Sequence, residues 1–245
     1  MIEDLWTVFW KEWKETPFQR GGRRGGLVGV FIFTGVIGIL LPAQAGRGWL
    51  DSPLVLLLSC WEPLFLVTSV IADAFAGERE RHTLETLLAS RLPDRAILFG
   101  KIAAGLAYGW GLMLLALLLG MVTVSLSQGH GQILPYTGEI GIGAAVLSFL
   151  AAWLAAGAGV LISLRAPTVR QAQQTLSLGA MVLTFLPLFG VRLLPVDARQ
   201  RLLTALQTGA TSEIVVIAAL VLAILDVILL AGAMLRFRRA RLVLD

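Results

Sequence analysis

Six long apolar runs constrain this chain more than any other feature of its sequence. They cover roughly residues 26–42, 53–76, 101–126, 140–164, 172–194 and 213–236. Each is close to the ~20 residues that a helix needs to cross a ~30 Å hydrocarbon layer. A helix satisfies its backbone hydrogen bonds internally, as a segment in lipid must. The sequence therefore predicts an all-α membrane protein with six transmembrane helices.

The composition agrees with a membrane protein that crosses the bilayer several times. Hydrophobic residues make up 57% of the chain and charged residues 15%, against about 45–50% and 25% in soluble domains. The net charge of +4 does not indicate nucleic-acid binding, because the basic residues lie between and beyond the apolar runs. We therefore expect no nucleic-acid partner.

The basic residues also predict the orientation of the chain. If the N-terminus is cytoplasmic, sixteen of the twenty Lys and Arg residues fall in cytoplasmic segments and four fall outside. The positive-inside rule favours this arrangement. We expect both termini to be cytoplasmic, a short basic tail over 237–245, and a location in the cell membrane (the inner or plasma membrane).

Residues 1–25 form a separate unit before the transmembrane domain of 26–236. Trp6, Phe9, Trp10 and Trp13 recur at helical spacing, and charged residues fill the other side of the helix. This pattern predicts an amphipathic helix that lies in the membrane interface with its indole rings at headgroup depth, in contact with lipid. The alternative is a helix that packs on the bundle, and the two interpretations are compatible.

A dense charged segment separates the second apolar run from the third. Leu84, Leu87 and Leu88 within it fall at i, i+3 and i+4, so they share one face of a predicted helix over 78–90. Pro93 cannot continue that helix. A short helix with an apolar ridge and charges of both signs suits docking to a soluble partner, and the alternative is a solvated charged loop.

The same segment resembles the signature of type-2 ABC transporter permeases. The run 78–88 followed by Pro93 and Gly100-Lys101 is similar to the family pattern acidic-x-acidic-x-Gly-Thr-Leu-Glu-x-Leu-Leu, then Pro and Gly-Lys. His82 stands where the family usually carries Gly, and a helix tolerates His better than Gly. Ile162-Ser163 and the run 170–174 give a second, weaker match.

The resemblance implies the membrane subunit of an ABC exporter, formed as a dimer with a second copy or a homologous permease. Such a subunit lacks its own ATPase site, and the sequence contains no Gly-x-x-x-x-Gly-Lys-Ser/Thr loop to hold phosphates. ATP and Mg would therefore bind to a partner ABC ATPase, and the chain itself needs no cofactor. The residues expected to dock the ATPase, as a coupling helix, are Glu78, Arg79, Glu80, Arg81, His82, Thr83, Leu84, Glu85, Leu87 and Leu88.

Acidic residues within the apolar runs are candidates for the translocation path. Glu62, between Trp61 and Pro63, and Asp226 lie well inside predicted spans. An ionisable group there costs about 2.5–3.5 kcal/mol on insertion scales, so it usually lines a pathway or has a partner. A path residue and a structural hydrogen bonder are equally good interpretations of each. His82 and His130 fall on opposite sides, so we expect no metal site and no catalytic site.

Two other functions fit parts of the sequence. A secondary transporter that works without an ATPase would use Glu62 or Asp226 to carry protons, and a membrane assembly scaffold would need neither. A scaffold leaves the pattern at 78–88 unexplained, and the inverted repeats and broken helices common in secondary transporters are not clearly present. The mostly aliphatic spans favour a lipophilic or amphipathic cargo over a sugar.

Overall fold

A computed structural model describes residues 2–15, 24–83, 91–193, 195–200 and 211–237. The described residues contain helices and no strand. The helices are α1 (Ile2–Glu15), α2 (Arg24–Gly35), the π-helix η1 (Val36–Leu40), α3 (Leu41–Ala45), the 3₁₀ turn η2 (Gly46–Trp49), α4 (Leu54–Glu80), α6 (Asp94–Gln128), α7 (Gly138–Ser163), α8 (Val169–Leu193) and α10 (Thr211–Arg236).

Five of these segments are long and apolar enough to cross a membrane: 30–49, α4, α6, α7 and 212–236. They correspond to five of the six predicted spans. The predicted span over 172–194 forms helix α8, but this helix is not among the five.

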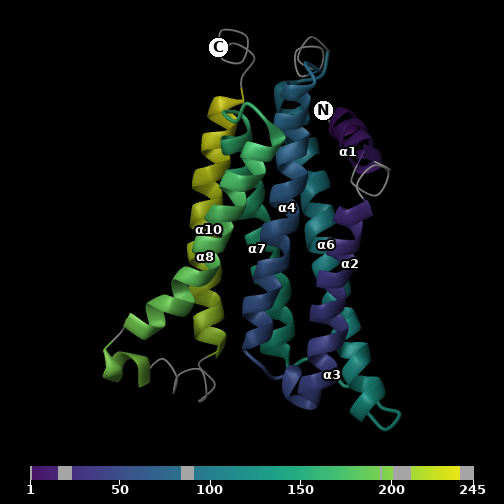
Figure 1. Cartoon of the computed structure of the whole chain (residues 1–245), viewed down its shortest axis with the longest axis vertical. Coiled ribbons are helices and arrows are strands. Elements are labelled where there is room, and N and C mark those ends of the chain that lie inside the picture. Colours follow the sequence, from purple (N-terminus) through teal and green to yellow (C-terminus); the bar gives the residue numbers. More distant parts are fainter. Residues whose placement is uncertain (1, 16–23, 84–90, 194, 201–210, 238–245) are drawn as a thin grey trace.

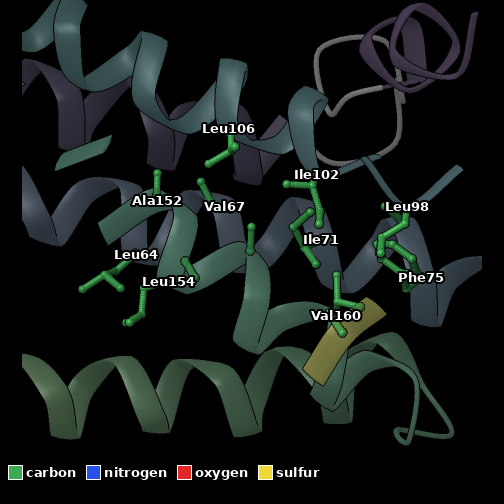
Figure 2. Close-up of a cluster of buried hydrophobic side chains, with 14 of the residues drawn as sticks. Leu64, Val67, Ile71, Phe75, Leu98, Ile102, Leu106, Ala152, Leu154 and Val160 are labelled. Carbon is green, nitrogen blue, oxygen red and sulfur yellow. The ribbon is translucent and has the colours of Figure 1, made fainter. Parts of the chain in front are cut away.

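Helix α4 lies at the centre of the bundle and packs against α6, α7 and α8. In Figure 2, Val67 and Ile71 of α4 lie between Ile102 and Leu106 of α6 on one side and Val160 of α7 on the other. Small residues allow this close approach of backbones. Glycines of α6 and α7 form these contacts, because Cβ atoms added to them would strike α4. At Gly109 the Cβ would overlap Val67, at Gly105 it would lie 3.0 Å from Ile71, and at Gly159 it would lie 2.7 Å from Ile71.

The first apolar segment is irregular where it crosses α6. The helix widens from α-helix to π-helix at η1, and Gly38 within η1 lies against α6 so closely that a Cβ would be 2.9 Å from the carbonyl oxygen of Ala116. The carbonyl oxygen of Gly38 accepts a hydrogen bond from Thr123 Oγ1 at 3.2 Å. One extra residue per turn thus rotates the segment and brings a glycine to the contact.

The two ends of the bundle differ in charge. Helix α1, the end of α4, the beginnings of α6 and α8, and the ends of α7 and α10 lie together at one end, which we call the charged end (Figure 1). Helix α8 starts there beside α7 and diverges from α10 toward the other end (Figure 1). Basic residues at the charged end include Lys11, Lys14, Arg79, Arg81, Arg95, Lys101, Arg165, Arg170 and Arg236.

The central packing makes a testable prediction at two glycines of α6. Gly109→Ala should lower the free energy of unfolding by about 1–3 kcal/mol, because the new methyl group overlaps the stiff side chain of Val67. Gly111→Ala is the control, since a Cβ there meets nothing within 4 Å. Unfolding in detergent followed by circular dichroism measures both, and equal stabilities would contradict the packing.

Candidate functional site

The sequence predicted that a new helix begins at residue 78. In the structure, residues 78–80 instead form the last turn of α4, and 81–83 form the turn that follows. Helix α4 continues through Glu80, and its last carbonyl groups accept bonds from the turn that follows. The amide of Thr83 donates to the carbonyl oxygen of Glu78 at 2.9 Å, and the amide of His82 donates to that of Arg79 at 3.1 Å. This is the Schellman pattern of a helix end. Residues Leu84, Glu85, Leu87 and Leu88 of the predicted coupling helix lie outside the described residues.

His82 takes the residue position at which a helix end favours glycine. Its φ angle is 56°, in the left-handed region, which costs a residue with a Cβ about 1–2 kcal/mol. The expectation that a helix accommodates His82 better than glycine is therefore wrong, because this residue is not in a helix. The glycine typical of the family pattern at this position is explained by the turn.

Glu78, in the last turn of α4, belongs to a cluster of four charges in which Glu78 and Lys101 are buried. Its Oε1 lies 3.0 Å from Lys101 Nζ of α6 and 3.1 Å from Lys11 Nζ of α1. Glu12 of α1 lies 2.7 Å from the same Lys101 ammonium and 3.7 Å from Lys11 Nζ. Lys101 is fully buried and also donates to the carbonyl oxygen of Ala74 at 2.9 Å. We call these four residues the charge cluster.

The charge cluster joins three helices that are distant in the sequence. Gly100, just before Lys101, permits the approach of α1, because a Cβ there would lie 2.7 Å from Val8. Burial lowers the pKa of Lys11, but the attraction and hydrogen bond of Glu78, together with the attraction of Glu12 and Glu15, outweigh it and hold that pKa above its usual range. Sequence analysis noted Gly100-Lys101 as part of a motif and missed Lys11 and Glu12 as its partners.

The neighbouring charges of α4 bind the turn between α7 and α8. Arg79 Nη1 donates to the carbonyl oxygen of Leu164 at 2.8 Å, and Glu80 Oε2 accepts from the amide of Val169 at 3.0 Å. Arg81 Nη2 lies 3.6 Å from Oδ1 of Asp73, which is about two turns back on α4. Three consecutive residues, 78–80, therefore tie the end of α4 to α1, α6 and the α7–α8 turn. We call this arrangement the junction.

Helix α1 confirms the predicted N-terminal helix and presents its aromatic residues outward. Val8 is buried against α6, while Trp6, Trp10 and Trp13 are 60%, 47% and 40% exposed. Trp6 and Phe9 stack with ring centroids 5.2 Å apart, and Phe9 and Trp13 at 5.9 Å. One face of α1 thus packs on the bundle while the stacked aromatic side chains remain uncovered by the described residues.

The structure does not bring the two candidate path acids together. Glu62 is fully buried, and its Oε1 accepts a 2.6 Å hydrogen bond from Thr34 Oγ1 of α2. Asp226 is buried on α10, which packs against α7, and neither carboxylate oxygen has a hydrogen-bond partner among the described residues. Trp61 packs edge-on against Phe33, and α4 continues through Pro63 without a break.

Comparison with known proteins identifies the family. The profile described as "ABC-2 type transporter" matches residues 3–193, which take in α1 through α8. The chain belongs to this family. It is the multi-pass membrane permease subunit of an ABC transporter, and family membership implies an ABC ATPase as its partner. No curated protein matches the chain significantly.

The charge cluster predicts a large effect of removing Glu78 from the permease. Glu78→Ala should lower the free energy of unfolding by about 3 kcal/mol, because a buried ammonium loses one of its two carboxylates. Glu139→Gln changes an exposed carboxylate of α7 and should stay within about 0.5 kcal/mol of the native chain. Thermal unfolding of the purified proteins compares them, and a similar midpoint for both would refute the role given to Glu78.

The turn after α4 predicts a substitution that stabilises the protein. His82→Gly should raise the free energy of unfolding by about 1 kcal/mol, since glycine relieves the left-handed strain but adds freedom to the unfolded chain. His82→Val is the matched variant and should destabilise, because a β-branched residue is poorly accepted at positive φ. Denaturant titration of the three proteins should give the order Gly, His, Val.

Proposed function

We propose that the permease forms the translocation path of an ATP-driven exporter as a dimer, with separate ATPase subunits that press on the segment after α4. The junction is the observation that carries this proposal. Residues 78–80 hold α1, α6 and the α7–α8 turn at once. A force applied just beyond Thr83 would therefore move four elements together rather than bend one loop.

The arrangement of the ends supports a cytoplasmic location for the charged end. Basic residues concentrate there, as the positive-inside rule expects of the cytoplasmic side. Helix α8 starts at this end and finishes toward the other (Figure 1). We therefore infer that α8 completes a sixth crossing, which puts α1 and the end of α10 on the cytoplasmic side of the cell membrane.

Exposed apolar faces support contact with lipid and with a second permease chain. The aromatic face of α1 suits the headgroup layer, where indole rings are enriched. Helix α10 is exposed along most of its length, including Ile217, Ile224 and Val227. Such surface requires lipid or another membrane helix around it, and a second copy or a homologous permease would cover part of it. The mostly aliphatic spans suit a lipophilic cargo.

Co-purification tests the docking of an ATPase. The tagged permease, extracted gently from its native membrane, should carry a Walker-A protein in a stoichiometric amount. Leu87→Glu should remove that partner by placing a charge on the predicted leucine ridge, whereas Thr86→Glu, on another face of the predicted helix, should keep it. If no ATPase accompanies the native chain, either in several detergents or in lipid discs, the proposal fails.

A second candidate function, proton-coupled transport without an ATPase, rests on the buried carboxyl groups of Glu62 and Asp226. Glu62→Gln distinguishes it. Glutamine keeps the side-chain size and can accept the bond from Thr34 but cannot exchange a proton. Under the ABC proposal this variant should transport at close to the native rate in vesicles supplied with ATP. Transport driven by a pH gradient alone, and lost in Glu62→Gln, would favour the second candidate.

A further inference from the structure

An open cavity lies at the charged end, beside the α7–α8 turn that the junction holds. It has a volume of about 610 Å³ and is enclosed by the end of α7, the α7–α8 turn, the start of α8 and the last turns of α10. This volume is within the ~300–1,000 Å³ of typical small-molecule sites. None of the four charge-cluster residues lines it. The cavity therefore needs an explanation of its own.

One wall of the cavity is cationic and polar. Arg165 of the α7–α8 turn and Arg236, the last residue of α10, both line it, together with Gln171 and Thr175 of α8. Among the described residues, no carboxylate lies within ion-pair distance of either guanidinium group. Glu80, the carboxylate that reaches this turn, accepts the amide of Val169 instead. Two guanidinium groups thus line one cavity without a counter-ion among the described residues.

The rest of the lining, which we call the aliphatic wall, is apolar and lies nearer the middle of the bundle. It consists of Leu161 and Ile162 of α7 and Ile228 and Leu229 of α10. Ile228 precedes Arg236 by eight residues, which is ~12 Å along a helix axis. The cavity therefore changes from cationic to aliphatic over about the distance between a phospholipid phosphate group and the upper part of its acyl chains.

We propose that this cavity binds an anionic phospholipid from the adjacent membrane leaflet. The phosphate group would lie between Arg165 and Arg236, and an acyl chain would lie along Leu161, Ile228 and Leu229. Guanidinium groups form paired hydrogen bonds with phosphate oxygens, and basic pockets between transmembrane helices suit anionic headgroups. The site lies beside the junction and requires no ATPase.

Other ligand classes fit the two walls less well. A sugar would leave the aliphatic wall against polar hydroxyl groups, and a cation would be repelled by both arginines. A free anion would satisfy the arginines but leave the apolar part of the cavity open. The ordinary interpretation of these arginines is that they extend to water at the membrane surface. That interpretation accounts for the charges but not for the aliphatic wall in the same cavity.

Native mass spectrometry of the full-length permease tests the proposal. The protein is exchanged into detergent containing equal amounts of phosphatidylglycerol and phosphatidylcholine, and the bound lipids are counted and identified. The native chain should retain phosphatidylglycerol in preference. The double variant Arg165→Gln/Arg236→Gln should retain roughly tenfold less, because both charge-assisted contacts are lost. Arg170→Gln is the matched control, since Arg170 is an exposed arginine of the same region that does not line the cavity.

A second variant tests the aliphatic wall without changing charge. A Cβ on Gly232 lies 3.6 Å from Leu161, an ordinary contact, so Gly232→Leu fits the helix and occupies the cavity. It should also lose phosphatidylglycerol. The proposal is overturned if the native chain retains both lipids equally or if the double arginine variant binds phosphatidylglycerol like the native chain. Complete displacement of the lipid by excess inorganic phosphate would assign the cavity to a free anion and would also overturn it.

Discussion

The buried ammonium group of Lys101 is the constraint on which the charged end depends. An ammonium group at this depth requires compensation, because an uncompensated buried charge costs several kcal/mol. The compensation comes from Glu78 and Glu12, which belong to two other helices. The position of α1 relative to α4 and α6 is therefore fixed by electrostatics as well as by the contact of Val8 with Gly100. An apolar contact alone would allow α1 to slide along α6. The charge cluster, with its four charged residues, restricts that movement.

Two kinds of contact hold the bundle together, and each predominates in a different part of its length. Within the apolar layer, close contacts of glycine and alanine with the branched side chains of α4 join the helices, and these contacts have no hydrogen-bond requirement. At the charged end, the contacts are directional, and residues 78–80 make those that reach α1, α6 and the α7–α8 turn from α4. The apolar contacts tolerate small rotations of α4, whereas the charged contacts transmit them to α1, α6 and the α7–α8 turn. This division suits the proposed function, in which an ATPase drives the membrane domain from one side.

The sequence predicted the parts of this fold that follow from local pattern. Hydropathy located the helices, and the aromatic period of 6–13 located α1. The sequence-based prediction placed the end of α4 incorrectly. In a charged run such as 78–81, no local feature distinguishes the last turn of one helix from the first turn of the next. The ion-pair partners of the charge cluster could not be predicted either, because Lys101 and Glu12 are 89 residues apart and no periodicity links them. The cavity at Arg165 and Arg236 depends on three helices meeting, so its charges appeared in the sequence only as part of the positive-inside count.

The segment 78–83 shows how one motif can serve two roles that are hard to separate in sequence. Its charges read as a surface for a partner, yet Glu78 is buried and Arg79 and Glu80 bind the protein's own turn. Those residues therefore have little capacity left for an external partner. If an ATPase docks here, the contact falls to residues after Thr83, where the leucines lie in the sequence. Under the proposed function, residues 78–80 of this chain assemble the junction, the turn at His82 follows, and the predicted leucine ridge after the turn would receive the force.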